Sequence, residues 1–389
     1  MTSTFYPPYH LGGDATHVKY LAEELVKIGH EVHVFYSKDA YMIKRRNLPK
    51  ITESQGVFTN QFESRLNFSP YFVYLFGNSP EIIRKFNLLV KEIRPDVVHH
   101  HNISLLGYRI FSSSSSCLNL YTAHDYWLIC SQNNFFINGT RECTGPSCIT
   151  CALRRKRLPQ LWRYTRGFKK ALNKIDLVIA PSNYIQERLT EQINNKSVVI
   201  SNFVPYPPKN ISQASYSNYY LFVGLLEKHK GIINLIKIFC KSHNKIGAKL
   251  LIVGNGSLKT YIQHYIRQYS LDNFILFIGS VSTDKLYSLY KGACALIVPS
   301  IWPETSSLVV MEALSVGTPA IVSNMGALPE IMRKVDNSLI FTNFDELENI
   351  LINFPKNNID KNKVTSIYGE NFSPKVYLDR YIKSIEALQ

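Results

Sequence analysis

The feature that most limits the fold of this chain is a repeated alternation of short apolar runs with helix-length segments. Short apolar runs, here of three to six residues and bounded by loops, are typical of strands in a parallel sheet that is covered on both faces. Two such series joined by a linker predict an α/β protein with two Rossmann-like, doubly wound domains that face each other across a cleft. The first series is Glu31–Tyr36, Asp96–His99, Leu118–Thr122, Leu177–Ala180 and Val198–Ile200, and the second is Tyr219–Val223, Lys249–Val253, Phe274–Ile278, Ala295–Pro299 and Ala320–Val322.

The linker between the two series sets the domain boundaries. Residues Phe203–Asn218 are rich in Pro, Ser and Asn, as segments between domains commonly are. We therefore predict an N-terminal domain over residues 1–202 and a C-terminal domain over residues 203–372. The amphipathic segment 373–389 is expected to form a helix that packs back on the first domain.

The first residues of the chain contain only the second half of a βαβ unit. A loop with Gly12 and Gly13 leads into a helix with Val18, Leu21 and Leu25 on one face, and a strand follows. The strand that should precede the loop is missing. The expectation is that the natural start lies upstream of Met1 or that this end is truncated.

Composition and charge narrow the class of protein. Hydrophobic residues make up 45% of the chain and charged residues 19%, which is typical of a globular protein. No apolar run reaches the ~18–20 residues that span a bilayer, and the N-terminus resembles no signal peptide, so we expect a soluble, cytoplasmic protein. The net charge of +15 favours anionic partners, namely nucleic acid, acidic lipid or phosphorylated substrates.

Two glutamates eight residues apart indicate a specific ligand. The stretch SIWPETSSLVVMEALSVGTPA places Glu304 before an apolar helix, Leu308–Val316, and Glu312 inside that helix. An unpaired carboxylate in such surroundings is costly, and the two hydroxyls of a nucleotide ribose would satisfy it. Backbone N–H groups of Ser306, Ser307 and Leu308 at the helix start would bind a diphosphate, and Glu304 would reach the attached sugar. The alternative is that Glu312 pairs with a Lys or Arg and that Glu304 is an acid of the first helical turn.

These residues and others along the chain resemble the family 4 glycosyltransferases, which are retaining enzymes of the GT-B fold. The Glu304-x7-Glu312 pair carries most of the resemblance. Shorter matching stretches occur in the expected order along nearly the whole chain, namely GGDATHV, GHEVHVF, DVVHHH, TAHDYW, IAPSNY, ISNFVP, FVGLLEKHKGI and IVGNGSL.

The resemblance implies roles for individual residues, and the chain departs from the family pattern at one of them. Lys230 would clamp the donor diphosphate, but Leu225 stands where an Arg is expected, so Lys228 or another cation would have to substitute. The Gly13 N–H would face the diphosphate, and His124 would contact the transferred sugar. The implied catalytic residues are His124, Lys230 and Glu304, and the implied nucleotide-binding residues are Gly12, Gly13, Gly224, Gly254, Gly256, Ser306, Ser307, Leu308 and Glu312. Each of the Gly, His and Lys positions also has a structural interpretation, as a turn glycine, a satisfied histidine or a surface lysine.

Catalysis is expected to need no metal. The chain has no Asp-x-Asp pair, which metal-dependent nucleotide-sugar enzymes of the other common fold would use. His99, His100 and His101 are consecutive, so strand alternation points neighbours to opposite faces, and no nearby acid completes a ligand set. We interpret them as residues at a strand end, with His101 the one that reaches the cleft.

Two further segments suggest structural and membrane roles. Cys130, Cys143, Cys148 and Cys151 could hold a structural zinc ion, although free thiols or a disulfide fit equally well. The segment Leu153–Lys174 interleaves basic residues with Leu, Trp, Tyr and Phe, which suits an anionic membrane surface, a single-stranded nucleic acid or a solvated basic helix.

The sequence thus predicts a retaining glycosyltransferase of the hexosyltransferase type. It would move a sugar from a nucleoside diphosphate donor to an acceptor hydroxyl, on a saccharide or a lipid-linked acceptor, in bacterial surface polysaccharide synthesis. Its expected location is the inner face of the cell membrane, as a peripheral protein with no nucleic-acid partner. The alternatives are a nucleotide-sugar epimerase of the same fold and a basic nucleic-acid-binding protein.

Overall fold

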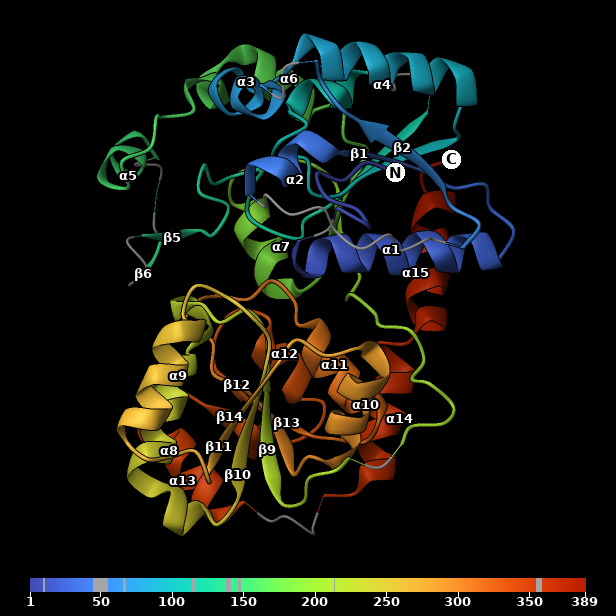
Figure 1. Ribbon diagram of the computed structural model, residues 1–389. Helices are drawn as coiled ribbons and strands as arrows, with labels where there is room; N and C mark the ends of the chain where they lie inside the picture. The colour runs from blue at the N-terminus through green and yellow to red at the C-terminus, as the bar shows by residue number, and fades with distance from the viewer. Residues whose placement is uncertain are drawn as a thin grey trace. The chain divides into compact units, whose positions relative to one another are not determined.

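The protein divides into two compact units, which are described separately (Figure 1). Unit 1 comprises residues 1–201 and 378–389, and unit 2 comprises residues 202–377. The computed structural model describes residues 1–9, 11–44, 55–65, 68–113, 117–137, 141–143, 145, 148–212, 214–354 and 359–389.

The main sheet of unit 1 is parallel and is completed by the first residues of the chain. The strands pair in the orders β1-β2 and β3-β4-β7-β8. Thr2 forms parallel bridges to Phe35 in β1 and to His100 in β3, so residues 1–4 lie between these two strands. The strands are β1 (His33–Ser37), β2 (Phe58–Phe62), β3 (Val97–His100), β4 (Leu118–Thr122), β7 (Leu177–Ala180) and β8 (Ser197–Val199), and β5 (Phe136–Ile137) pairs with β6 (Arg141–Glu142) in a small antiparallel ribbon.

Helices cover this sheet and bury its apolar residues. The amphipathic helix α1 (Gly12–Lys27) buries Val18, Leu21 and Leu25. A large aromatic cluster that includes Phe86, Phe111 and Trp127 forms much of the unit 1 core. The remaining helical segments are α2 (Lys38–Lys44), α3 (Ser69–Phe76), α4 (Pro80–Ile93), η1 (Tyr108–Ser112), α5 (Cys148–Arg154), η2 (Leu161–Tyr164), α6 (Arg166–Leu172), α7 (Asn183–Thr190) and α15 (Pro374–Glu386), whose last residues belong to unit 1.

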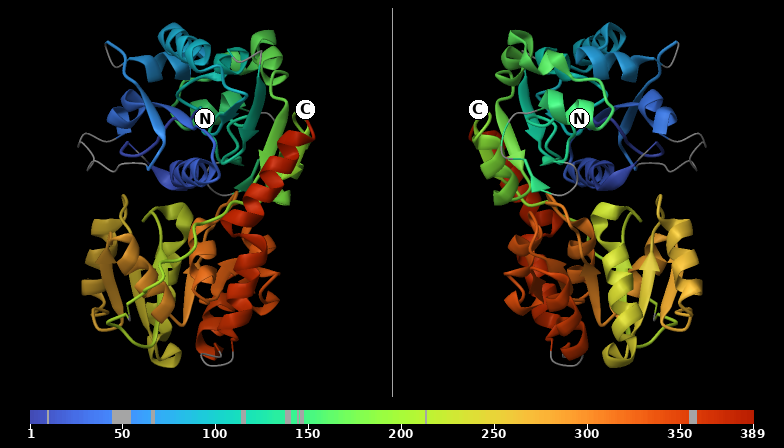
Figure 2. Two further views of the ribbon diagram at one scale, coloured as in Figure 1. Left: turned by 90° about the vertical axis from the view of Figure 1, so that its right-hand side faces the viewer. Right: turned by 90° about the vertical axis from the view of Figure 1, so that its left-hand side faces the viewer.

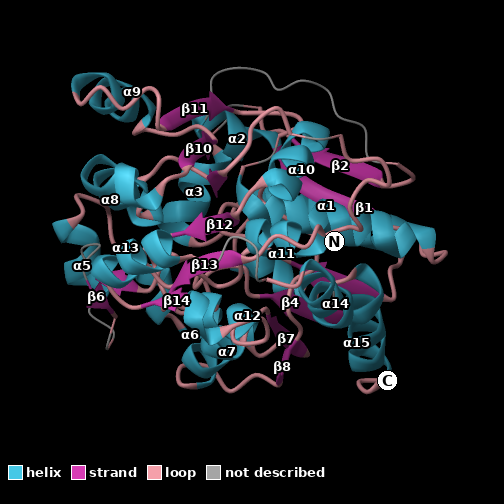
Figure 3. Cartoon of the chain, turned by 90° about the horizontal axis from the view of Figure 1, so that it is seen from below, coloured by secondary structure: helices cyan, strands magenta, loops and turns pink. Residues whose placement is uncertain are grey.

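Unit 2 is a doubly wound six-stranded parallel sheet with helices on both faces (Figures 1 and 3). Its strand order is β11-β10-β9-β12-β13-β14, so the direction of winding reverses between β9 and β12. In open α/β sheets ligands bind outside the carboxyl ends of the strands at such a switch point. The strands are β9 (Tyr219–Val223), β10 (Lys249–Val253), β11 (Ile275–Gly279), β12 (Ala295–Val298), β13 (Ala320–Ser323) and β14 (Ile340–Phe341).

The helices of unit 2 alternate with its strands. They are η3 (Lys228–Lys230), α8 (Ile232–Ile246), α9 (Lys259–Gln268), α10 (Thr283–Gly292), α11 (Leu308–Ser315), α12 (Leu328–Met332), η4 (Asn337–Leu339), α13 (Phe344–Asn353) and α14 (Lys361–Asn371). Figure 2 shows the colour gradient passing from green through yellow and orange to red across this unit. The predicted α/β class with parallel, doubly wound sheets is confirmed.

Candidate functional site

The candidate site lies at the switch point of unit 2, in the loops that follow β9 and β12. A backbone hydrogen bond of 2.9 Å from Ile301 N to His229 O joins the two loops. Gly231 ends η3 with a positive φ of 71°, and a Cβ there would lie 1.7 Å from Pro299 O. Only glycine therefore permits the two loops to approach this closely.

Lys230 and Glu304, which the sequence assigns to the donor diphosphate and sugar, form an ion pair here. The Lys230 Nζ lies 2.6 Å from Glu304 Oε1, and the Ser300 hydroxyl donates to the same oxygen at 2.6 Å. Glu304 is only 8% exposed. Burial alone would raise its pKa, but Lys230 and Ser300 together hold the pKa of Glu304 below its ordinary value. The site thus keeps an ionised acid and a cation side by side.

Glu312 lies on the buried helix α11 and has a single hydrogen-bond donor among the described side chains. It is 9% exposed, and the Tyr290 hydroxyl donates to Oε2 at 2.9 Å. Burial raises the pKa of Glu312 to about 7. The alternative of a Lys or Arg partner is not what the structure shows, because the hydrogen-bond partner of Glu312 is Tyr290 from α10.

Two of the predicted glycines keep neighbouring loops in close contact, and a Cβ at the third would make only an ordinary van der Waals contact. A Cβ on Gly254 would lie 1.9 Å from Gly224 O, and one on Gly256 would lie 2.6 Å from the Leu226 backbone. At Gly224 the nearest atom would be a Phe222 ring carbon at 3.9 Å. Leu225, where the family has an Arg, is 46% exposed. The loop after β9 therefore has room beside Gly224 and Leu225.

The start of α11 presents polar groups that suit an anion. Ser307 precedes the helix in extended conformation and makes no side-chain cap, so the first backbone N–H groups of the helix lack that partner. The Ser306 hydroxyl is buried and has no hydrogen-bond partner among the described residues. The predicted residues Ser306, Ser307 and Leu308 thus lie together at a helix start, where backbone N–H groups are available as hydrogen-bond donors.

In unit 1 the predicted His124 belongs to a cluster of histidines. His124 Nε2 lies 3.0 Å from His101 Nδ1, and the His17 ring, from α1, lies 5.1 Å from the His124 ring. Burial lowers the pKa of His124 to about 3 and lowers the pKa of His101 as well. Sequence reasoning missed His17, although the GGDATHV stretch contains it. It expected His101 to reach a cleft, whereas His101 is fully buried.

Gly12 and Gly13 are the first residues of α1. Gly12 has a φ of 87°, which favours glycine. The neighbouring Asp14 accepts a hydrogen bond of 2.8 Å from the Asn102 side chain, which fixes this turn to the loop after β3.

The four clustered cysteines are free thiols. Over the described ranges, no group of three or more His, Cys, Asp or Glu side chains is arranged to hold a metal ion. The spacing that suggested zinc is therefore not accompanied by a ligand cluster in this part of the chain. Cys143 Sγ instead donates to Gly145 O.

Two family profiles match the sequence and together span most of it. Residues 11–206 match the Glycosyltransferase Family 4 profile, and residues 208–372 match the profile of Glycosyl transferases group 1. The chain belongs to the family 4 glycosyltransferases. It is therefore an enzyme that transfers a sugar.

Known relatives and solved structures agree with this assignment. An uncharacterized glycosyltransferase of Methanocaldococcus jannaschii is 28% identical over 87% of this chain and 83% of its own length. An O-antigen chain mannosyltransferase of Salmonella typhimurium is 28% identical over 46% of this chain and 50% of its own. Sucrose-phosphate synthase from Thermosynechococcus elongatus covers 100% of both chains with a TM-score of 0.70 and 18% identity. The Anabaena protein HepE in complex with UDP covers 99% of both with a TM-score of 0.65 and 15% identity. This glycosyltransferase has the GT-B fold.

Proposed function

We propose that this glycosyltransferase is a retaining hexosyltransferase that uses a nucleoside diphosphate sugar as donor. Glu312 is the observation that carries the proposal. It is a buried acid at the switch point with one tyrosine donor, and burial disfavours its ionised form. A ribose diol would supply the two further donors that a carboxylate there needs.

The other residues of the switch point fit the remaining parts of such a donor. The N–H groups of Ser307 and Leu308 and the ammonium of Lys230 would bind the diphosphate. Glu304, held ionised by Lys230, would accept hydrogen bonds from the sugar. The solved structure of HepE, which binds UDP, supports a nucleotide in a fold of this kind.

The proposed transfer breaks the bond between the anomeric carbon and the diphosphate oxygen and forms a bond from that carbon to the acceptor oxygen on the same face. The acceptor proton passes to the leaving diphosphate, whose charge Lys230 stabilises. No enzyme nucleophile and no metal ion is assigned a role. His124, together with Gly12 and Gly13, would act on the transferred sugar and the acceptor.

The acceptor is proposed to be a saccharide on a membrane lipid, as part of bacterial surface polysaccharide synthesis. The Salmonella relative is named for O-antigen chain synthesis. No helix within the described ranges combines the length and apolar character that a bilayer crossing requires, so the proposal is a peripheral association with the inner face of the membrane.

An exposed apolar surface on unit 1 supports the membrane association. Helix α3 and the segment through η2 are joined by hydrogen bonds from Trp162 Nε1 to Tyr74 O at 3.0 Å and from Tyr74 Oη to Leu158 O at 2.9 Å. Apolar groups in solvent beside cations are typical of surfaces that insert into anionic bilayers. The exposed apolar residues of this surface, here called the α3–η2 surface, are Phe68, Tyr71, Phe72, Leu75, Phe76, Leu158, Leu161 and Tyr164, and its exposed basic neighbours are Lys156, Arg157, Arg166, Lys169 and Lys170.

A structural zinc ion on Cys130, Cys143, Cys148 and Cys151 is a separate hypothesis that rests on the sequence spacing. About one zinc per chain in metal analysis of purified protein, lost when Cys148 and Cys151 are replaced by serine, would support it. Absence of bound zinc would reject it.

A panel of nucleotide sugars tests the proposed function. Purified protein is melted with each donor, and the correct one should raise the melting temperature because it binds only the folded state. The change Glu312→Gln should remove this shift, whereas Glu348→Gln, at an acid that pairs with Lys241 elsewhere in unit 2, should retain it. A donor shift that survives Glu312→Gln would contradict the assigned ribose contact.

A further inference from the structure

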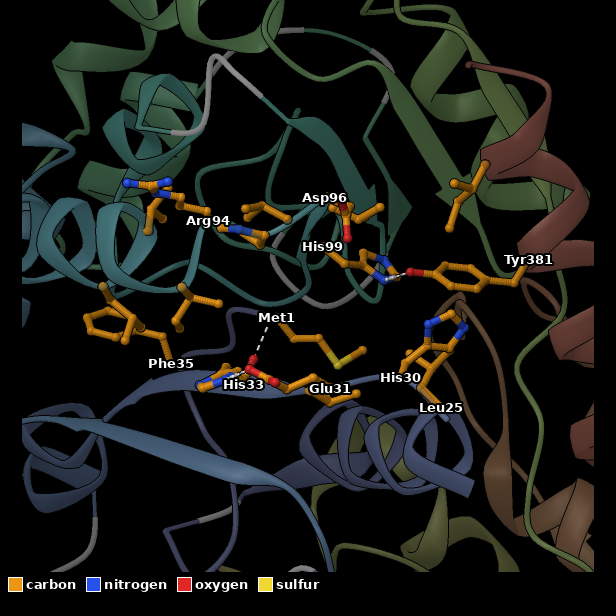
Figure 4. Close-up of a pocket in the computed structure, with 18 of the residues that line it drawn as sticks. Met1, Leu25, His30, Glu31, His33, Phe35, Arg94, Asp96, His99 and Tyr381 are labelled. Carbon is orange, nitrogen blue, oxygen red and sulfur yellow. Dashed lines mark hydrogen bonds and ion pairs between the residues drawn. The ribbon is translucent and has the colours of Figure 1, made fainter. Parts of the chain in front are cut away.

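An unused hydrogen-bond donor lies in the candidate site of unit 2. The Trp302 indole N–H is buried, yet it has no hydrogen-bond partner among the described residues. A buried N–H without an acceptor is costly, and aromatic side chains elsewhere in this chain have partners. Trp162 Nε1 donates to Tyr74 O at 3.0 Å, and the Tyr381 hydroxyl lies 3.1 Å from His99 Nδ1 (Figure 4). Trp302 departs from this pattern, and it does so in the site itself.

The Trp302 ring is held by two residues of the loop after β9. Its centroid lies 4.6 Å from that of the His229 ring and 6.0 Å from the Lys230 Nζ. Burial, and then the charge of Lys230, lower the pKa of His229, so the ring that packs on the indole is neutral at pH 7. Ring packing and a nearby cation both favour one orientation of the indole. The direction of its N–H is therefore set before any ligand binds.

The acceptor beside this N–H is the Glu304 carboxylate. Burial raises the pKa of Glu304, whereas Lys230, Ser300 and Trp302 lower it, so the indole N–H lies close to the carboxylate without a hydrogen bond to it. The Lys230 ammonium and the Ser300 hydroxyl both bind Oε1, each at 2.6 Å. The carboxylate is thus held on its lysine side, and the indole N–H is left over.

The main chain of Glu304 is fixed, so the movement available to this residue is a rotation of its side chain. Ala327 N donates to Glu304 O at 2.7 Å, and Glu304 pairs with Gly326 in a short parallel bridge. Only glycine fits at position 326, because a Cβ there would collide with Glu304 O. A small rotation of the carboxylate would exchange the ammonium for the indole N–H as its donor.

We infer that Trp302 is a positioning residue, which donates to Glu304 when Lys230 binds the donor diphosphate. The inference rests on the proposed function, because the diphosphate is what draws the ammonium away. Glu304 would then be a buried charge without its cation, which is costly. The indole N–H supplies a charge-assisted hydrogen bond in place of the ion pair. Glu304 stays ionised and oriented toward the sugar during transfer.

NMR of the indole groups tests this contact in the full chain without any nucleotide. The chain has three tryptophans, so isotope-labelled tryptophan gives three indole N–H signals, and Trp302→Phe identifies that of Trp302. Lys230→Met should move this signal downfield, because the released carboxylate accepts from the indole. Lys241→Met, at a lysine that pairs with Glu348 on the surface of unit 2, should leave it in place. The double variant Lys230→Met with Glu304→Leu lacks the acceptor and should also leave it in place.

Nucleoside diphosphates test the exchange itself. UDP, GDP, ADP and dTDP are added in turn to the parent chain, and binding is detected as a raised melting temperature. The diphosphate that binds should move the Trp302 signal downfield, as Lys230→Met does, with the signals of Trp127 and Trp162 in unit 1 as internal references.

The outcomes separate this inference from the proposed function. The inference is overturned if Lys230→Met leaves the Trp302 signal in place, if the double variant shows the same shift, or if a diphosphate binds without moving the signal. If Lys230→Met moves the signal but none of the four diphosphates binds, the contact between Trp302 and Glu304 is supported and the proposed donor site fails.

Discussion

The Lys230 ammonium lies 2.6 Å from the Glu304 carboxylate, so each of these side chains fixes the position and charge of the other. Replacing Lys230 by Met should leave Glu304 buried without its cation and remove a charge from the diphosphate. We expect transfer to fall about 100-fold or more and the melting temperature to drop. Steady-state kinetics with the matched donor measures the first effect.

The matched control for that change is Lys241→Met. Lys241 also pairs with a glutamate, Glu348, at 2.9 Å in unit 2, but on the surface, where such pairs contribute little. The transfer activity of the Lys241→Met variant should stay within about twofold of that of the parent chain. Equal losses in both variants would show that Lys230 acts only through the stability of the unit.

The exposed Leu225 offers a gain-of-function prediction. Leu225 is 46% exposed, so an arginine there could extend into solvent and would restore the cation that the family pattern has beside Gly224. Leu225→Arg should tighten nucleoside diphosphate binding by about tenfold, as measured by calorimetry, whereas the unbranched but neutral Leu225→Met should not. If both variants bind like the parent, the diphosphate does not approach this loop.

If Glu312 binds the ribose as proposed, nucleotide binding should depend on pH. Its pKa in the folded chain is about 7, above the ordinary value of 4.5. The ribose hydroxyls would bind the ionised form, so affinity should fall by up to about tenfold per unit as pH drops below 7. Calorimetry in buffers of different ionisation enthalpy should also detect proton release on binding at pH 6.5. Affinity that is constant from pH 5.5 to 8 would contradict the role of Glu312.

The same raised pKa has a cost in stability. Between pH 4.5 and 7 the folded chain holds a proton on Glu312 that the unfolded chain has released, so the stability contributed by that proton is present at low pH and lost as pH rises through 7. Glu312→Gln keeps an acceptor for Tyr290 and carries no charge. It should raise the melting temperature at pH 8 by a few °C while removing donor binding. A lower melting temperature at pH 8 would mean that the buried charge has partners beyond Tyr290.

The sequence predicted the parts of the fold that depend on local composition. The predicted strands Leu118–Thr122 and Tyr219–Val223, both rich in apolar and aromatic residues, match β4 and β9 residue for residue. Strand β2 was not predicted, because FTNQF is mostly exposed and lacks an apolar run. Side-chain contacts between residues far apart in sequence could not be predicted either. Tyr290 donates to Glu312 from the preceding helix, and His17 of α1 meets the ring of His124, which follows β4.

The buried histidines of unit 1 should make the protein sensitive to acid. Burial lowers the pKa of His100 and of His124 to about 3, and the pKa values of His99 and His101 are lowered too. Stability from the neutral rings is fully present above pH 6.5 and is lost as pH falls below it, because the unfolded chain binds the protons first. The melting temperature should therefore fall between pH 7 and 5. His100→Asn should remove about one of the protons taken up on unfolding, so its melting temperature should fall less steeply with pH. His264→Asn, at an exposed histidine of unit 2, should leave the slope unchanged.

The α3–η2 surface should bind vesicles through apolar insertion and charge together. In co-sedimentation, the protein is expected to bind vesicles of anionic lipid and to bind neutral vesicles much less, with binding reduced by salt. Each exposed apolar side chain that enters the interface gains up to about 1.5–3 kcal/mol, so Phe72→Asp with Leu161→Asp should weaken binding by more than about tenfold. Tyr261→Asp, at an exposed aromatic of unit 2, serves as the control and should bind like the parent. Equal binding by all three proteins would place the membrane contact elsewhere, whereas loss confined to the double variant would assign it to α3 and η2.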